Sequence, residues 1–262
     1  MDYGYQLLRH VVQQVFGNLR QAARLTLTLF ILPIAGFLAL TGGTAAGMGH
    51  GFGGGTLIGL LLLLVGTVIA YAWAAVGWHR YVLLEEMGNG LIPPWRGDRI
   101  LSYLGRAIAV GVVVILAVMG GSLVVGLIAA VTQSFAVALV LGIGLVFLAT
   151  WVATRIGLVL PAAALGAPMS LRESWAVTRP VASQILLPLI VIALVAGIAQ
   201  QFVLLLFGQT VTAHMFGMMQ DQTILSLPGQ ILNAALTWLQ LLVNLALMTT
   251  LYGNLVEGRQ LN

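Results

Sequence analysis

Six runs of apolar residues, separated by short polar segments, dominate this 262-residue chain. Each run approaches or exceeds the about 20 residues that an α-helix needs to cross the hydrocarbon core of a bilayer. In lipid, a helix satisfies all of its backbone hydrogen bonds within one segment. The sequence therefore predicts an all-α, polytopic membrane protein, a bundle of six transmembrane helices. The expected spans are residues 22–40, 56–78, 107–131, 135–161, 185–207 and 231–252.

The composition agrees with a chain whose solvent is mostly lipid. Hydrophobic residues make up 60% of the chain and charged residues only 7%. A soluble globular chain carries about 25% charged residues, so this chain could not cover a water-facing surface. The six spans leave no room for a separate soluble domain. We expect a short cytoplasmic helix over residues 1–21, followed by one six-helix transmembrane domain over residues 22–262.

The first 21 residues place apolar side chains at helical spacing, with polar residues between them. This pattern predicts an amphipathic helix. Two placements remain open for it. The helix lies on the membrane surface with its apolar face in the lipid boundary, or it packs as a soluble-type helix against the loops. The apolar positions are Leu7, Leu8, Val11, Val12, Val15, Phe16 and Leu19.

The basic residues alternate between successive loops. All eleven are Arg, and they lie in the N-terminal segment, the second loop, the fourth loop and the tail. Because positive charge stays on the cytoplasmic side, both termini and these two loops are expected in the cytoplasm. The outer loops are then the Gly-rich segment 41–55, a tight turn at 132–134 and the segment 208–230. The last of these is long enough to fold, and we expect a short surface helix there.

The two Arg-bearing loops share a pattern, and we call them the first joint (80–99) and the second joint (155–179). Each begins at an Arg, contains Pro and rejoins apolar sequence through Trp-x-x-x-Arg. In the second joint, Ser170-Leu-Arg-Glu173 is a capping box, which predicts that a helix begins just after Ser170. With one gap, the joints align as a weak internal repeat. Such repeats occur in transporters, and equally in membrane proteins that transport nothing.

The joints also carry side chains suited to contact lipid phosphates. Long Arg side chains reach towards the interface, and Trp rings settle at the same level. Membrane lipids are therefore expected partners. The residues that we expect to anchor the protein in this way are Arg80, Trp95, Arg99, Arg155, Arg172, Trp175 and Arg179.

The passage Arg155-Ile-Gly-Leu-Val-Leu-Pro161, followed by Ser170-Leu-Arg-Glu-Ser-Trp-Ala-Val-Thr-Arg179, resembles a known superfamily. It is similar to the membrane domain of bacterial glycerophosphoryl diester phosphodiesterases and to the related stand-alone, six-span YciC-like proteins. In that superfamily an Arg and a Pro end one span, and an Ala/Glu-Ser-Trp-x-x-Thr segment opens the next. The resemblance implies a six-span protein of the bacterial cytoplasmic membrane. The catalytic barrel of the fused enzymes is absent from this sequence, so no hydrolase activity is implied.

A polar stripe runs through spans five and six. Polar residues inside spans are the best pointers to function in a membrane protein. Two interpretations remain open. The stripe forms a polar path or a headgroup pocket, or it supplies hydrogen bonds between helices, each worth about 0.6 kcal/mol on average. The stripe consists of Asn233, Thr237, Gln240 and Asn244 at helical spacing on span six, with Gln200 and Gln201 at a matching depth on span five.

Other patterns argue against catalysis, cofactors and metals. His79, Glu85 and Glu86 lie close in sequence, but no nucleophile or metal-ligand spacing accompanies them, and we expect interfacial charge paired with nearby Arg. The absence of Cys excludes disulfides and thiolate metal sites. The Gly-rich segment 47–55 lacks the Lys-Ser/Thr of a phosphate loop. A soft-metal site at His214, Met215, Met218 and Met219 is conceivable, but Met side chains dipping into the interface are expected instead.

These observations favour a non-enzymatic integral membrane protein, with no cofactor and no nucleic-acid partner. We expect a scaffold, assembly factor or accessory subunit that contacts other membrane proteins, further copies of itself or lipids. The alternative is a transporter or channel for a lipid-like or uncharged small solute. An intramembrane enzyme has the least support. Small residues four apart permit close helix approach, at Ala117/Gly121, Gly126/Ala130, Ala153/Gly157 and Ala193/Gly197.

Overall fold

The computed structural model describes residues 2–45, 54–88, 90–215 and 218–261, and their side chains except those of 41–45, 54–56, 212–215 and 218–220. Six helices are long and apolar enough to cross a membrane. The prediction of an all-α protein with six membrane-spanning helices is therefore confirmed. The candidate spans are Leu19–Leu40, Leu57–Leu84, Gly97–Thr132, Phe135–Leu165, Leu186–Phe207 and Leu227–Leu255.

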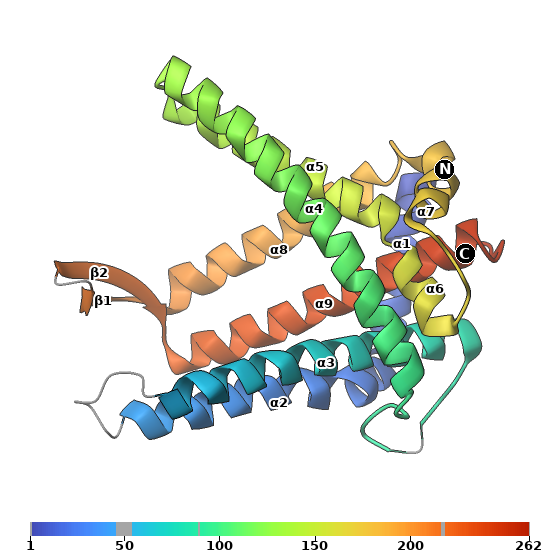
Figure 1. Cartoon of the computed structure of the whole chain (residues 1–262), viewed down its shortest axis with the longest axis horizontal. Helices are drawn as coiled ribbons and strands as arrows, with labels where there is room; N and C mark the ends of the chain where they lie inside the picture. The colour runs from blue at the N-terminus through green and yellow to red at the C-terminus, as the bar shows by residue number, and fades with distance from the viewer. Residues whose placement is uncertain (1, 46–53, 89, 216–217, 262) are drawn as a thin grey trace.

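Figure 1 shows that both termini, α6, α7 and the two joints lie at one end of the molecule, which we call the arginine end. The strands and the α4–α5 turn lie away from it. The elements are α1 (Tyr3–Gly17), α2 (Leu19–Ala45), α3 (Gly54–Leu84), α4 (Gly97–Thr132), α5 (Phe135–Ile156), α6 (Val159–Leu165), α7 (Leu171–Val177), the 3-10 turn η1 (Arg179–Val181), α8 (Leu186–Phe207), β1 (Gly208–Met215), β2 (Met218–Leu225) and α9 (Leu227–Leu255).

The amphipathic helix α1 is tied into the bundle. Leu7, Val11 and Val15 are fully buried and belong to the main apolar core, in which α1 packs chiefly on α9 and α8. The neighbouring strip of Val12 and Phe16 lines an apolar groove that α1 forms with the same two helices. The helix therefore packs chiefly on two spanning helices.

The well-packed core is concentrated near the arginine end. It joins α1, α3, α4, α6 and α9 around fully buried side chains such as Trp78, Leu158 and Leu251. Further along, the α4–α5 hairpin diverges from α8, α9 and α3 (Figure 1). Buried positions of α4 accordingly stop at Val110, and Leu127 is 69% exposed. The far part of this hairpin packs mainly on itself.

A very short connection joins α4 to α5. Gln133 ends α4 in the left-handed conformation, with φ of 49°, which is the usual way to terminate a helix with one residue. Ser134 then caps α5, because its hydroxyl accepts a hydrogen bond from the amide of Val137 (3.4 Å). The predicted tight antiparallel hairpin is confirmed.

The predicted span 135–161 lies within the candidate span Phe135–Leu165, but its helix is interrupted after Ile156. The hydroxyl of Ser174 donates to the carbonyl of Arg155 (2.7 Å) and accepts from the amide of Leu158 (3.2 Å). These bonds satisfy backbone groups that would otherwise pair along the helix, so the chain turns at Gly157 and restarts as α6. The spacing of residues in the sequence does not reveal that a distant side chain replaces these backbone hydrogen bonds.

The prediction of a short surface helix in segment 208–230 is wrong. That segment forms an antiparallel hairpin in which Gln209 pairs with Ile224 and Val211 with Gln222. Its β-branched residues, including Thr210, Val211 and Ile224, favour a strand over a helix. The side chains of the suggested soft-metal group, His214, Met215, Met218 and Met219, lie outside the described set, as do residues 46–53 of the Gly-rich loop.

Candidate functional site

Arg155 is the centre of the second joint, and its side chain points into the protein. Only 4% of the residue is exposed. Its Nε donates to the Thr178 hydroxyl (3.2 Å), and its Nη2 donates to the carbonyl of Trp175 (2.9 Å). The guanidinium lies 3.5 Å from the ring centroid of Trp175 and 4.9 Å from that of Trp151. Such stacking over aromatic faces is a favourable position for a cation.

The residues that carry the family resemblance therefore form one structural lock between α5 and α7. Ser174, Trp175 and Thr178 each contact Arg155 through a hydrogen bond or a ring. The predicted capping box is confirmed, because Ser170 and Glu173 exchange both expected hydrogen bonds. The amide and hydroxyl of Ser170 also hold the pKa of the Glu173 carboxyl below its ordinary value. We call this set, with Trp151, the Arg155 lock.

The first joint repeats part of this geometry. Trp73 packs edge-to-face on Trp95 with centroids 4.8 Å apart, and Trp151 packs on Trp175 in the same manner at 5.7 Å. In each pair the indole of the span residue also donates to a backbone carbonyl, that of Pro93 (3.1 Å) within the first joint. The corresponding bond from Trp151 reaches the carbonyl of Ala182 (2.7 Å). The joints thus share a Trp pair as well as a sequence pattern.

Sequence reasoning missed Trp73 and Trp151. A signal was present in each case. Trp73 lies two helical turns before Arg80, and Trp151 lies one turn before Arg155, so each tryptophan shares a helix face with the Arg that opens its joint. That spacing was visible, but which carbonyl each indole would reach depends on the fold of the joint.

Arginines from α3 and α4 bind the two joints together. Arg80 donates to the carbonyl of Ala164 (3.0 Å), and Arg106 donates to that of Met169. Arg99 lies directly over Gly166, whose φ of 83° ends α6 in the left-handed region. These arginines therefore fix the loop between α6 and α7.

Glu86 is the acidic centre of the first joint. It forms ion pairs with Arg80 (2.5 Å) and with Arg96 (2.7 Å). Burial raises the pKa of the Glu86 carboxyl, but hydrogen bonds from Arg96 and Arg80 and their charges lower it by more, so it lies below its ordinary value. The expectation that these acidic residues pair with nearby Arg is confirmed for Glu86.

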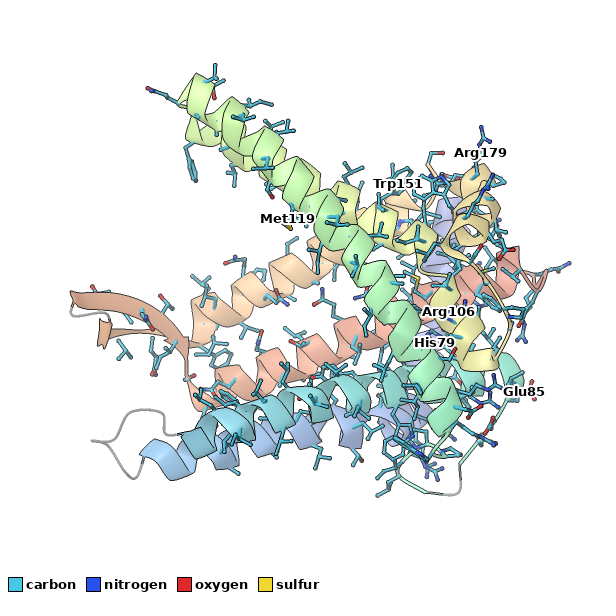
Figure 2. All side chains as sticks on the ribbon, viewed as in Figure 1. His79, Glu85, Arg106, Met119, Trp151 and Arg179 are labelled. Carbon is cyan, nitrogen blue, oxygen red and sulfur yellow. The ribbon has the colours of Figure 1, made fainter. Side chains whose placement is uncertain are left out.

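The three residues considered for acid–base chemistry do not come together. His79 is fully buried, with its Nδ1 2.8 Å from the hydroxyl of Thr249, whereas Glu85 is exposed at the surface (Figure 2). Interfacial charge is thus a wrong description of His79. Within the described residues, no group of three His, Asp or Glu side chains could hold a metal ion.

The expected lipid-contacting residues divide into two groups. Arg80 and Arg155 are committed to contacts inside the protein, and Arg99 is half-exposed and paired with Asp98 (3.0 Å). Four of the expected residues remain at the surface, namely Trp95, Trp175, Arg172 and Arg179. Figure 2 shows Arg179 extending outward at the arginine end. Neither the Arg172 nor the Arg179 side chain has a hydrogen bond or an ion pair within the described part of the chain.

The polar stripe of the two last spans is largely unpaired in the protein. We call its six residues (Gln200, Gln201, Asn233, Thr237, Gln240 and Asn244) the amide face. Gln200 donates to Gln240 at 3.4 Å, and the Thr237 hydroxyl bonds back to the carbonyl of Asn233 (2.8 Å). Among the described residues, the side-chain amides of Gln201, Asn233 and Asn244 have no hydrogen-bond partner.

The position of the amide face follows from the divergence of the hairpin. On α9, Leu251 and Leu247 lie two turns after Asn244 and Gln240 on the same helix face. Both leucines are buried, at 0% and 1% exposure, within the core cluster that includes α6. Further from the arginine end the same face is uncovered, and Asn244 and Thr237 are exposed.

A separate cavity of ≈ 400 Å³ lies between α1, α9 and the C-terminal tail. Its polar lining is mostly engaged in internal bonds. Thr250 donates to Gln14 (3.1 Å), and Arg259 donates to the carbonyl of Leu83 (2.6 Å). This cavity therefore ties the tail to the bundle and presents few free polar groups.

Comparison with models of known protein families, with curated proteins and with solved structures gives no match to this chain. The arrangement described above is consequently the basis for a functional proposal.

Proposed function

We propose that this chain is a non-enzymatic, multi-pass protein of a bacterial cytoplasmic membrane that acts as an accessory subunit or assembly factor on another membrane protein. The observation that carries the proposal is the amide face. Gln201, Asn233 and Asn244 lie within membrane-spanning helices, and their side chains have no hydrogen-bond partner among the described residues. In hydrocarbon an unpaired polar group costs several kcal/mol. A polar partner at that depth is therefore favoured over lipid tails.

The α4–α5 hairpin supports the same proposal. Only 6% of the most apolar stretch of each of these spans is buried, against 28% for the first span. Lipid alone can cover such apolar surface, so exposure by itself requires no protein. Another membrane protein would cover this apolar surface together with the polar side chains of the amide face.

The arginine distribution supports an orientation with both termini in the cytoplasm. The arginine end carries Arg172 and Arg179 at its surface, and positive charge is retained on the cytoplasmic side. We include in the proposal that these two side chains, with the half-exposed Trp95 and Trp175, contact lipid phosphates. Arg155 does not contact lipid phosphates in this proposal, because its guanidinium is enclosed by the Arg155 lock.

Native mass spectrometry of the protein, extracted gently from its own membrane, tests the proposal. A discrete protein partner at fixed stoichiometry is the expected result. A bare chain that retains one lipid or one small solute would contradict it. That outcome favours the alternative function of a transporter or channel for a lipid-like or uncharged solute, and flux measurements on Asn244→Leu would then follow.

A further inference from the structure

Building on the proposed accessory function, we infer that the amide face is a docking site for a single transmembrane helix of the partner protein. The docking site runs along α9 from Asn233 to Asn244 and includes Gln200 and Gln201 on α8. The incoming helix carries at least one hydrogen-bonding side chain at the level of Gln240 and Asn244.

The chemistry of the occupant follows from the side chains that it must satisfy. An Asn or Gln amide offers two donors and a carbonyl acceptor, and three of these amides have no partner within the described residues. Lipid tails supply neither donors nor acceptors. A helix satisfies its own backbone internally and can still present Ser, Thr, Asn or Gln side chains at a chosen depth.

The shape of the face fits close helix approach. Gln201 lines a hollow of ≈ 490 Å³ on α8 together with Ala193 and Gly197. A Cβ on Gly197 would have no atom within 4 Å, so the backbone is accessible there. Small residues of this kind let two helices in a membrane approach closely.

The protein itself already uses this face of α9 to bind a helix. Nearer the arginine end Leu247 and Leu251 are buried in the core cluster that includes residues of α6, and α6 is one of the helices that pack on α9. Beside them, the sulfur of Met248 lies 3.1 Å from where a Cβ on Gly157 would be placed. The docked helix would continue this packing along the uncovered remainder of the face.

A single helix suits the site better than a second copy of the chain. The α4–α5 hairpin projects away from α8 and α9 (Figure 1). A second copy would have to bring its own projecting hairpin and the rest of its bundle past this obstacle. We therefore assign the site to one helix of a different protein.

Site-specific photo-crosslinking in intact membranes tests this assignment. The photoreactive residue p-benzoylphenylalanine replaces Asn244 in one variant and Gln201 in another. Leu62 of α3, which is 69% exposed, serves as a lipid-facing control. We expect one protein adduct of the same mass from both test positions and none from the control. The crosslinked peptide should come from a membrane-spanning segment of the partner.

A substitution pair measures the contribution of the polar contacts. Asn244→Leu should reduce the partner retained during extraction about tenfold, the effect of one or two lost intramembrane hydrogen bonds. Thr67→Val is the matched control, because the Thr67 hydroxyl bonds to the carbonyl of Leu63 on its own helix (2.7 Å). Retention should be unchanged in that variant. A thermal melt of each variant separates a binding defect from a folding defect.

The possible outcomes distinguish the inference from the proposed function. A partner that co-purifies but crosslinks only elsewhere overturns the docking site and leaves the accessory function standing. Adducts with lipid alone, or with a second copy of this chain, also overturn the docking site. If Asn244→Leu fails to fold, the crosslinking result decides. The absence of any protein partner in both experiments overturns inference and function together.

Discussion

At the scale of single residues, the joints hold their charges in two different ways. Arg155 forms no ion pair with a carboxylate in the described part of the chain, and a hydroxyl, a carbonyl and two indole faces stabilise its charge. Arg80 instead shares a carboxylate with Arg96. The sequence predicted that both arginines lie at the boundary of a span. It could not predict that Arg155 is enclosed, because Trp175 and Thr178, which accept its hydrogen bonds, follow it by 20 and 23 residues.

Replacement of Arg155 should destabilise the folded protein. Arg155→Met removes two charge-assisted hydrogen bonds and the stacking on Trp175 and Trp151, and we expect a loss of about 2 kcal/mol of stability. Thermal unfolding in a detergent micelle measures the change. Arg172→Met is the matched control, since Arg172 is exposed and has no bond within the described residues. Equal melting temperatures for the two variants would show that Arg155 does not act as a lock.

The Glu86 ion pairs should make stability depend on acidity. Since the pKa of Glu86 is lowered in the folded protein, its contribution is complete above the unfolded-state pKa and is lost as pH falls through the folded pKa. Glu86→Gln should therefore be less stable than the parent at neutral pH, and the difference should vanish in acid. Unfolding curves across pH measure this. Glu85→Gln, at an exposed carboxylate without an ion pair in the described part of the chain, should be about as stable as the parent protein at neutral pH.

At the scale of secondary-structure elements, the sequence predicted those helix boundaries and turns that are determined by neighbouring residues. The spans, the helix that begins after Ser170 and the tight turn at Gln133 follow from hydropathy, capping and short spacing. The break after Ile156 arises because a side chain of α7 satisfies the backbone of α5. The divergence of the hairpin depends on packing between helices. Neither cause is visible in a window of the sequence.

The α4–α5 hairpin should respond differently to two similar substitutions. A Cβ on Gly121 would meet the side chain of Leu145, whereas one on Gly126 would meet nothing within 4 Å. Gly121→Ile should therefore force the helices apart and cost about 1–3 kcal/mol through overpacking, and Gly126→Ile should be close to neutral. Thermal unfolding compares the two variants. A hairpin that tolerates both changes equally would contradict the described packing of α4 on α5.

At the scale of the whole molecule, the same end carries both termini, both joints and their arginines (Figure 1). The amide face was predicted from helical spacing as a stripe. Its exposure could not be predicted, because it results from the way in which the hairpin leaves α9. The exposure of the stripe is therefore set by packing between helices that lie far apart in the sequence.

Single cysteines test the proposed orientation, since the chain contains no Cys of its own. Gln260→Cys lies in the exposed tail at the arginine end, and Gln209→Cys lies on the exposed edge of β1 at the opposite end. A membrane-impermeant maleimide applied to spheroplasts should label only Gln209→Cys. Inverted vesicles should show the reverse. Labelling of Gln260→Cys from outside would contradict the cytoplasmic placement of the termini.

Electron cryo-microscopy of the protein, extracted with its surrounding membrane into lipid-polymer discs, tests the central claim most directly. The account predicts one additional helix-shaped density along α9 between Asn233 and Asn244, with a side chain in contact with Asn244. Density for lipid tails alone on this face would contradict it. So would a hairpin closed onto α9, because the amide face would then be satisfied within the chain.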